Sequence, residues 1–355
     1  MAGWPARASA PSQRAKIAAA ALRWGIRPVL NHLTDSTLGV LAGRQLVAGT
    51  LALLSPPLPG TRITPVDERG ADGRVRGEWV RAEGVADEPS DAEGCLYYLH
   101  GSGYAICSPS THRGITSRLS ALTGLPVFSV DYRLAPRYRF PTAALDVERG
   151  WRWLTTGYHP AERIVVAGDS AGGHLAIDLC LALLRAGSPL PAAQALLSPV
   201  ADLTLGLAGH REQLRPDPMI SAAAARRLIG IYTRDVDPTD ARLAHVLAGG
   251  EQLPPTLIHA GGREILAADA HHLARMLQAG GTPCHLRIWP GQLHVFQALV
   301  RLVPEAAEAL AEVADFLLDA LPPTCASRTD DGRADGGAQG RAAGRGRRIG
   351  IRRSA

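Results

Sequence analysis

The sequence lacks a long hydrophobic run. No stretch of 18 apolar residues passes without a charged residue or a proline, so we expect no membrane span. The short apolar run at residues 17–22 is interrupted by Arg23, and no small-residue cleavage site follows it. We therefore expect no signal peptide either.

Cysteines are few, and their spacing is irregular. The chain has 5 of them, an odd number without a CxxC pair, at Cys95, Cys107, Cys180, Cys284 and Cys325. Such a set does not form a regular disulfide framework. We interpret these residues as free thiols in a reducing compartment, which predicts a cytoplasmic protein.

Excess charge of either sign is missing from most of the chain. Residues 324–355 contain eight Arg and three Asp, which accounts for the whole net charge of +5. The rest of the chain gives no electrostatic reason to expect nucleic acid or a membrane as its partner. A small neutral substrate fits better, and the tail itself, rich in Gly, Arg and Ala, is predicted to be disordered.

The N-terminal part of the chain predicts helices followed by strands. With 46% hydrophobic residues, the chain can bury a large core. Apolar residues recur at helical spacings over residues 16–54, which predicts two or three helices before the Pro-rich stretch at 55–60. Residues 62–66 and 77–82 predict an antiparallel pair of strands around a polar turn at 67–73.

Beyond Pro89, short apolar runs alternate with longer helical stretches. The runs lie at residues 95–99, 126–130, 164–167, 193–197, 256–259 and 285–289. Such runs suit strands that are buried on both faces, and their alternation with helices predicts an α/β fold with a mostly parallel sheet. In this architecture the functional loops lie at the carboxyl ends of the strands.

One interval breaks the alternation. Between residues 199 and 254 no strand pattern appears, while residues 221–233 predict a helix. An insertion into the α/β core explains this interval. The last helix is expected over residues 304–321, because Pro322 and Pro323 would end it.

Residues 168–172 read Gly-Asp-Ser-Ala-Gly, a G-x-S-x-G motif. The motif follows a strand-like run at 163–167 and precedes a helical stretch at 174–185, which is the strand, turn and helix that it requires. Small residues around Ser170 let the turn tighten without a Cβ clash. Its hydroxyl would then lie at a helix N-terminus, where the dipole favours negative charge. We predict Ser170 to be a nucleophile; an ordinary glycine-rich turn is the alternative.

A second glycine-containing loop, His100-Gly101-Ser102-Gly103-Tyr104, follows the predicted strand at residues 95–99. A loop of this kind can turn its backbone N–H groups toward an oxyanion. We expect the donors to be the N–H groups of Ser102, Gly103 and Ala171. A tight turn with a structural histidine is the alternative.

Three ordered motifs resemble the hormone-sensitive-lipase-like (family IV) esterases and lipases of the α/β-hydrolase superfamily. They are HGSGY at residues 100–104, DYRLAP at 131–136 and GDSAGG at 168–173. The resemblance covers roughly residues 93–317 and implies an α/β-hydrolase fold with a helical cap. It also implies supporting roles for His100, Gly101, Asp131, Arg133, Gly168, Asp169 and Gly172, with Asp131 and Arg133 bracing the 100–104 loop.

The chain departs from the family pattern at Ser102, which replaces the middle glycine of the usual His-Gly-Gly-Gly. Its backbone N–H is retained, but a positive φ would strain a serine there. Together, the sequence patterns and the resemblance predict an N-terminal cap segment (1–58), a first part of the core (59–200), a cap insertion (201–253), a second part of the core (254–321) and the tail (322–355).

A general base should follow the nucleophile and an acid in chain order. His294 lies in the loop after the last predicted strand, where its imidazole can accept the Ser170 proton, and the loop resembles the family's G-x-x-H-x-F. Glu264 lies after the predicted strand at 256–259 and is our choice for the acid. The family usually has Asp at this position, and Asp269, expected in the next helix, is the second choice. A surface histidine without a role is the alternative for His294.

No metal or cofactor is expected. His271 and His272 are adjacent on a predicted helix and point in different directions, so they do not form a pair of metal ligands. The Gly101-Ser102-Gly103 sequence lacks the third glycine of a dinucleotide-binding loop.

These observations predict a serine carboxylesterase for short- to medium-chain esters that works through an acyl-serine intermediate. A lipase or an amide hydrolase would use the same residues. A non-catalytic, receptor-like member of the fold is a further alternative, but such members replace the catalytic histidine, and His294 is present. The expected partner is a small ester, not nucleic acid, and a homodimer is left open.

Overall fold

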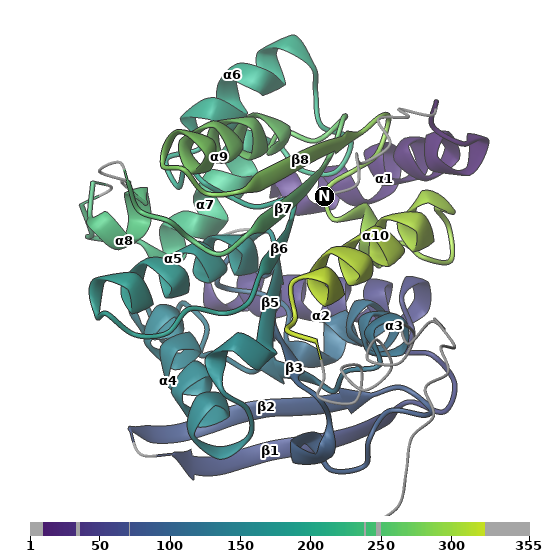
Figure 1. The fold of residues 1–355 in the computed structure, drawn as a ribbon. Coiled ribbons are helices and arrows are strands. Elements are labelled where there is room, and N and C mark those ends of the chain that lie inside the picture. The colour runs from purple at the N-terminus through teal and green to yellow at the C-terminus, as the bar shows by residue number, and fades with distance from the viewer. Residues whose placement is uncertain (1–9, 33–35, 71, 238, 246–249, 324–355) are drawn as a thin grey trace, which may run out of the picture. The chain divides into compact units, whose positions relative to one another are not determined.

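An eight-stranded sheet forms the centre of the computed structural model, in the order β1-β2-β4-β3-β5-β6-β7-β8 (Figure 1). The structure describes residues 10–32, 36–70, 72–237, 239–245 and 250–323. The described residues up to Pro322 form one compact unit. The predicted disorder of the tail falls on residues outside those described, apart from its first two positions.

Six of the eight strands run parallel, as the alternating pattern predicts. The strands are β1 (Arg62–Gly70), β2 (Gly73–Arg81), β3 (Cys95–Leu99), β4 (Val127–Val130), β5 (Ile164–Asp169), β6 (Gln194–Leu197), β7 (Thr256–Gly261) and β8 (Cys284–Trp289). Every residue of β3 to β7 is buried. Helices cover both faces of these strands, so their sequences are apolar without alternation.

The first hairpin is longer than predicted. The expected turn at residues 67–73 is mostly strand, because β1 and β2 pair over their whole length up to Gly70 and Gly73. Asp67 lies opposite Arg76 and forms an ion pair with Arg74. The charged residues that suggested a turn, such as Asp67, therefore lie in β1, the edge strand, and pair with residues of β2.

Helices pack on both faces of the sheet (Figure 1). They are α1 (Gln13–His32), α2 (Thr37–Leu54), α3 (Arg113–Thr123), α4 (Thr142–Gly157), α5 (Ala171–Arg185), α6 (Gly206–Leu214), α7 (Ala222–Tyr232), α8 (Ala241–Ala244), α9 (Ala267–Ala279) and α10 (Glu305–Asp319). Helices α4, α5 and α9 bury apolar residues on one face, and α3 and α10 do so on the other. The predicted helices at 221–233 and 304–321 correspond to α7 and α10.

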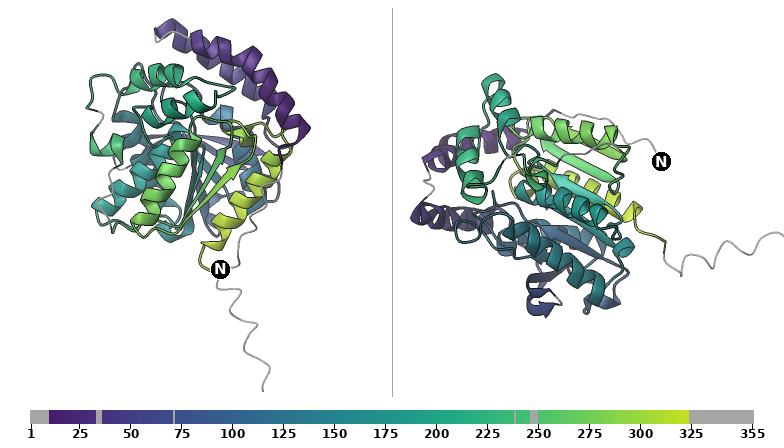
Figure 2. Two further views of the ribbon diagram at one scale, coloured as in Figure 1. Left: turned by 90° about the horizontal axis from the view of Figure 1, so that it is seen from above. Right: turned by 90° about the vertical axis from the view of Figure 1, so that its left-hand side faces the viewer.

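Hydrogen bonds to residues far away in the sequence attach the two N-terminal helices to the rest of the protein. The backbone N–H and the hydroxyl of Ser12, just before α1, donate to the carboxylate of Glu305 at 2.6 and 3.0 Å. In α2, the guanidinium of Arg44 donates to the carbonyls of Ala105 and Ala135 at 2.9 and 3.0 Å. Both helices are visible at one edge of the unit in the right-hand view of Figure 2.

Helix α2 is long and apolar enough to cross a membrane by length and composition alone, the one such helix among the described residues. It has 18 residues, and its single charge, Arg44, interrupts the apolar run. The Arg44 guanidinium donates hydrogen bonds to two backbone carbonyls of the core. One face of the helix is therefore attached to the protein.

Candidate active site

Ser170 lies in a sharp turn between β5 and α5. Its backbone has φ 51° and ψ −117°, a conformation that an L-residue adopts only at an energetic cost. A Cβ on Gly172 would clash with the Leu99 carbonyl, and one on Gly168 would lie 2.5 Å from the Gly172 carbonyl oxygen. Glycine at both positions therefore lets the turn close and presents the Ser170 hydroxyl at the N-terminus of α5.

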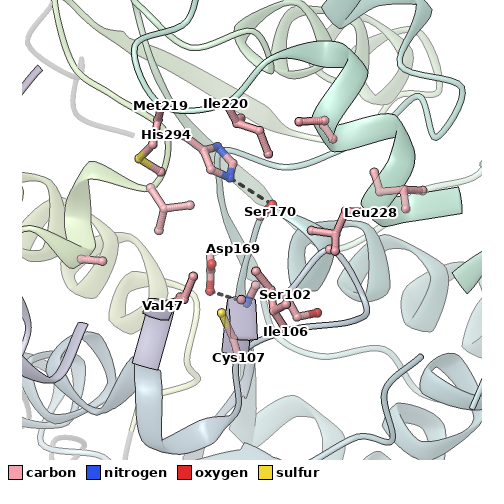
Figure 3. A pocket seen from close by; sticks show the side chains of 18 of the residues that line it. Val47, Ser102, Ile106, Cys107, Asp169, Ser170, Met219, Ile220, Leu228 and His294 are labelled. Carbon is pink, nitrogen blue, oxygen red and sulfur yellow. Dashed lines mark hydrogen bonds between the residues drawn. The ribbon is translucent and has the colours of Figure 1, made fainter. Parts of the chain in front are cut away.

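The structure brings Ser170, His294 and Glu264 into one hydrogen-bonded row. His294 Nε2 lies 3.1 Å from Ser170 Oγ, and His294 Nδ1 lies 2.6 Å from Glu264 Oε2 (Figure 3 shows the first contact). The other carboxylate oxygen of Glu264 accepts the backbone N–H of Gly261 at 2.6 Å. Asp269 lies in α9 instead and accepts the N–H groups of Ala201 and Asp202.

The pKa of His294 reflects its burial and its acidic neighbours. Burial acts to lower this pKa, but the hydrogen bond and the charge of Glu264 raise it above its ordinary value, with smaller contributions from Asp217 and Asp169. The Glu264 side chain is fully buried. A buried carboxylate of this kind stabilises the imidazolium and orients the ring.

The loop at residues 100–104 places its positive φ angles at Gly103 (52°) and Tyr104 (61°), and Ser102 has none. The backbone strain that a positive φ would cause at Ser102 is therefore absent. Its Oγ accepts the N–H of Tyr104 at 2.8 Å and lies 2.7 Å from the Tyr132 hydroxyl. Within the described chain, the backbone N–H groups of Ser102, Gly103 and Ala171 donate to no other group.

Asp169 fastens the same loop from behind. Its Oδ1 accepts the Tyr98 hydroxyl at 2.7 Å and the Gly101 N–H at 2.9 Å, and its Oδ2 lies 3.3 Å from His112 Nε2. Burial alone would raise the pKa of Asp169, but His112, the Tyr98 hydroxyl and the Gly101 N–H hold it below its usual value. The loop is thus tied to a buried charge beside Ser170.

Asp131 and Arg133 do not brace the loop, contrary to expectation. Arg133 forms a two-bonded ion pair with Asp146 of α4, with both distances 2.8 Å, and the Asp131 side chain is exposed. Tyr132, which lies between them in the sequence, supports the loop instead. The Tyr132 hydroxyl donates to the His100 carbonyl at 2.5 Å, and its ring stacks on the His100 ring at 4.2 Å.

Sequence reasoning missed several groups that hold the acid and base loops. The buried carboxylate of Asp217 accepts the N–H of Ile265 at 2.9 Å. Arg211 of α6 donates to the carbonyls of Glu264 and Gly262. Ser198 accepts the N–H of Val295, the residue after His294, at 3.0 Å. These contacts join residues that lie 48 to 97 positions apart in the sequence, so no local motif predicts them.

A cavity of about 240 Å³ opens onto Ser170 and His294. Its walls are mostly apolar and come from the two N-terminal helices, the 100–107 loop, the 200–231 segment and the C-terminal loops (Figure 3). Labelled examples are Val47 of α2, Ile106, Ile220 and Leu228 of α7. Ser170 and His294 are therefore polar groups in the wall of a mostly apolar pocket.

Ser102 gives a test of the loop's internal support. Ser102→Ala should lower the free energy of unfolding by about 1–3 kcal/mol, because the buried Tyr104 N–H loses its partner. Urea denaturation would measure this. Ser110→Ala is the matched control, since the exposed Ser110 hydroxyl bonds only to that of Ser108, and it should change stability by less than about 0.5 kcal/mol. Equal effects of the two changes would contradict the assigned support.

Comparison with known proteins supports the fold and an ester-hydrolase activity. Residues 96–298 match a family model described as the alpha/beta hydrolase fold. The carboxylesterase/phospholipase LipF of Mycobacterium tuberculosis is 34% identical over 353 residues, covering 95% of this chain and 90% of LipF. An acetyl-hydrolase of Streptomyces hygroscopicus is 35% identical over 246 residues, covering 69% and 80% of the two chains.

A solved structure of an esterase from the bacterial hormone-sensitive lipase family is similar throughout. It superposes with a TM-score of 0.76 at 30% identity, covering 88% of this chain and 100% of the other. The chain belongs to the α/β-hydrolase family, among the carboxylic ester hydrolases that resemble hormone-sensitive lipase.

Proposed function

We propose that this chain is a serine carboxylesterase in which Ser170 is the nucleophile, His294 the general base and Glu264 the acid that orients it. The supporting observation is the row of contacts Ser170 Oγ to His294 Nε2 (3.1 Å) and His294 Nδ1 to Glu264 (2.6 Å). His294 takes the Ser170 proton while Oγ attacks the ester carbonyl. The protonated imidazole then gives this proton to the leaving alcohol, which leaves an acyl-serine.

The negative charge of the tetrahedral intermediate needs donors that are already in place. The N–H groups of Ser102 and Gly103 from one side and of Ala171 from the other are proposed for this role, because none of them is engaged elsewhere in the described chain. The N-terminus of α5 adds its dipole. Water activated by His294 then releases the acid and restores Ser170.

Ser170→Ala tests the nucleophile directly. Turnover of a p-nitrophenyl ester should fall by at least about 10³-fold, because the acyl-enzyme route is lost. Circular dichroism should show an unchanged fold. Ser110→Ala, which changes an exposed hydroxyl, should retain wild-type turnover. Retained activity in the Ser170 variant would refute the assignment.

The pH profile tests Glu264. His294 must be neutral to act as a base, so kcat rises as pH rises through its pKa, which Glu264 holds above the ordinary value. In Glu264→Gln the amide oxygen keeps the Gly261 N–H and the NH₂ turns to His294 Nδ1. This moves the ring proton to Nε2, so kcat should fall by roughly 10³–10⁴-fold. The acidic limb of any residual activity should move to lower pH.

Asp269→Asn is the control for this experiment. The asparagine oxygen can still accept the N–H groups of Ala201 and Asp202, so kcat and the position of the acidic limb should stay unchanged. If Asp269→Asn moved the limb and Glu264→Gln did not, Asp269 would be the acid.

The cavity supports short- and medium-chain acyl groups as substrates. Its volume of about 240 Å³ is just below the range of about 300–1,000 Å³ for sites that hold drug-sized ligands. Its apolar walls suit an acyl chain. Helices α1 and α2 and the 201–253 segment form the cap in this proposal, because Leu22, Val47 and Leu228 from these parts line the same space.

Val47→Phe tests the cap's influence on acyl length. A larger side chain on the inner face of α2 should lower kcat/KM for octanoate relative to acetate esters by about tenfold or more. Leu41→Phe, on the outer face of the same helix, does not contact the cavity and should leave the ratio unchanged. A common shift in both variants, or in neither, would argue against this role of α2.

A cytoplasmic location is part of the proposal. Cys95, Cys107, Cys180 and Cys284 are free thiols, and Cys95 and Cys180 are buried. Burial raises the pKa of Cys107 to about 12 and that of Cys284 to about 12, so neither thiol has the character of a reactive thiolate. Unpaired cysteines are typical of proteins in a reducing compartment.

A further inference from the structure

The outer face of α2 is apolar and uncharged, although it faces solvent. Leu38 is 79% exposed, Leu53 67% and Leu41 47%, and the exposed positions between them are Ala42, Gln45, Gly49 and Ala52. The inner face is apolar as well, because it lines the cavity. A helix on the surface of a protein ordinarily has a polar outer face. An exposed apolar face of this kind indicates a surface that binds a partner.

The charges on the two N-terminal helices are all of one sign. Helices α1 and α2 contain no acidic residue, whereas Arg14, Lys16 and Arg23 are exposed basic residues of α1. Trp24 is 78% exposed, with the Arg23 guanidinium 5.7 Å from its ring centre. The near-neutral charge of the whole body conceals this local excess. Together, the two helices thus expose Trp and Leu along with Arg and Lys, the composition of helices that bind at an anionic lipid surface.

We propose that the exposed faces of α1 and α2 dock on the surface of an anionic phospholipid bilayer, with the helices lying in the plane of the interface. Arg44 ties α2 to the core through the carbonyls of Ala105 and Ala135, which suits a helix lying on the bilayer better than one crossing it. Leu22 of α1 and Val47 of α2 line the cavity, so the docked face adjoins the site that receives the ester.

A second copy of the chain is a poorer occupant of this face. A symmetric dimer would place the same patch against itself, which brings the basic residues of α1 toward one another with no acidic residue on either helix to pair with them. Anionic headgroups supply the opposite charge that a second copy lacks.

Vesicle binding by the full-length chain tests the proposal. Ser170→Ala protein, which prevents turnover of lipid, is mixed at about 0.15 M salt with vesicles of phosphatidylglycerol and phosphatidylcholine or of phosphatidylcholine alone, and bound protein is measured by flotation. Binding should be stronger to the anionic vesicles. Leu38→Glu with Leu53→Glu should weaken it by at least about tenfold, because two leucines leave the interface and two negative charges enter it.

Leu145→Glu with Leu318→Glu is the matched control. These leucines, on α4 and α10, are 41% and 36% exposed, and their replacement adds the same charge. The control keeps the arginines of the tail, so any binding through the tail is equal in both double variants. Neither pair lines the cavity, and with Ser170 restored both should hydrolyse a soluble p-nitrophenyl ester at the wild-type rate.

Three outcomes would overturn the proposal. They are wild-type-like binding by the α2 double variant, equal binding to neutral and anionic vesicles, and no vesicle binding together with a dimer that only the α2 changes dissociate in sedimentation. The readout is binding, so failure of the proposed esterase mechanism would leave this test unaffected.

Discussion

The close approach of α5 to the end of β3 is the constraint on which the site depends. The Leu99 carbonyl occupies the space where a side chain of Gly172 would lie. A larger residue would push α5 away from β3, and would separate Ala171 from the loop at residues 100–104. The proposed oxyanion donors come from both elements, so they converge only while the two elements touch. A missing Cβ thus sets the distance between the Ser170 hydroxyl and the donors beside it.

Two buried carboxylates, Asp169 and Glu264, hold the two halves of the site. Their hydrogen-bond partners differ, and so do their roles. Asp169 forms hydrogen bonds with Tyr98, His112 and the Gly101 N–H, so its charge holds the loop at residues 100–104 in place. Glu264 has one oxygen held by a backbone N–H and the other on His294, so its charge reaches the imidazole. Because a buried charge without partners is costly, each carboxylate also makes its loop resist displacement.

The positions of the parallel strands along the chain could be predicted from their apolar runs. Ser170, Glu264 and His294 could be predicted as well, because each follows one of these strands. Tyr132, His112 and Asp217 could not, since their partners lie in segments remote in the chain. Tyr132 lies inside the predicted motif, but the resemblance assigned the support to its charged neighbours, whereas the actual support is a hydroxyl and a ring. The length of the first hairpin was missed because charge pairs across edge strands look like a polar turn.

Helix α2 shows how one charge can orient an apolar helix. With apolar residues on both faces, burial alone does not decide which face turns inward. Arg44 decides it, because its guanidinium can donate to the Ala105 and Ala135 carbonyls only when its side of the helix faces the core. Leu38 and Leu53 then point to solvent. Since Ala105 directly follows the 100–104 loop, the contact that orients α2 lies next to the loop that carries two of the proposed oxyanion donors.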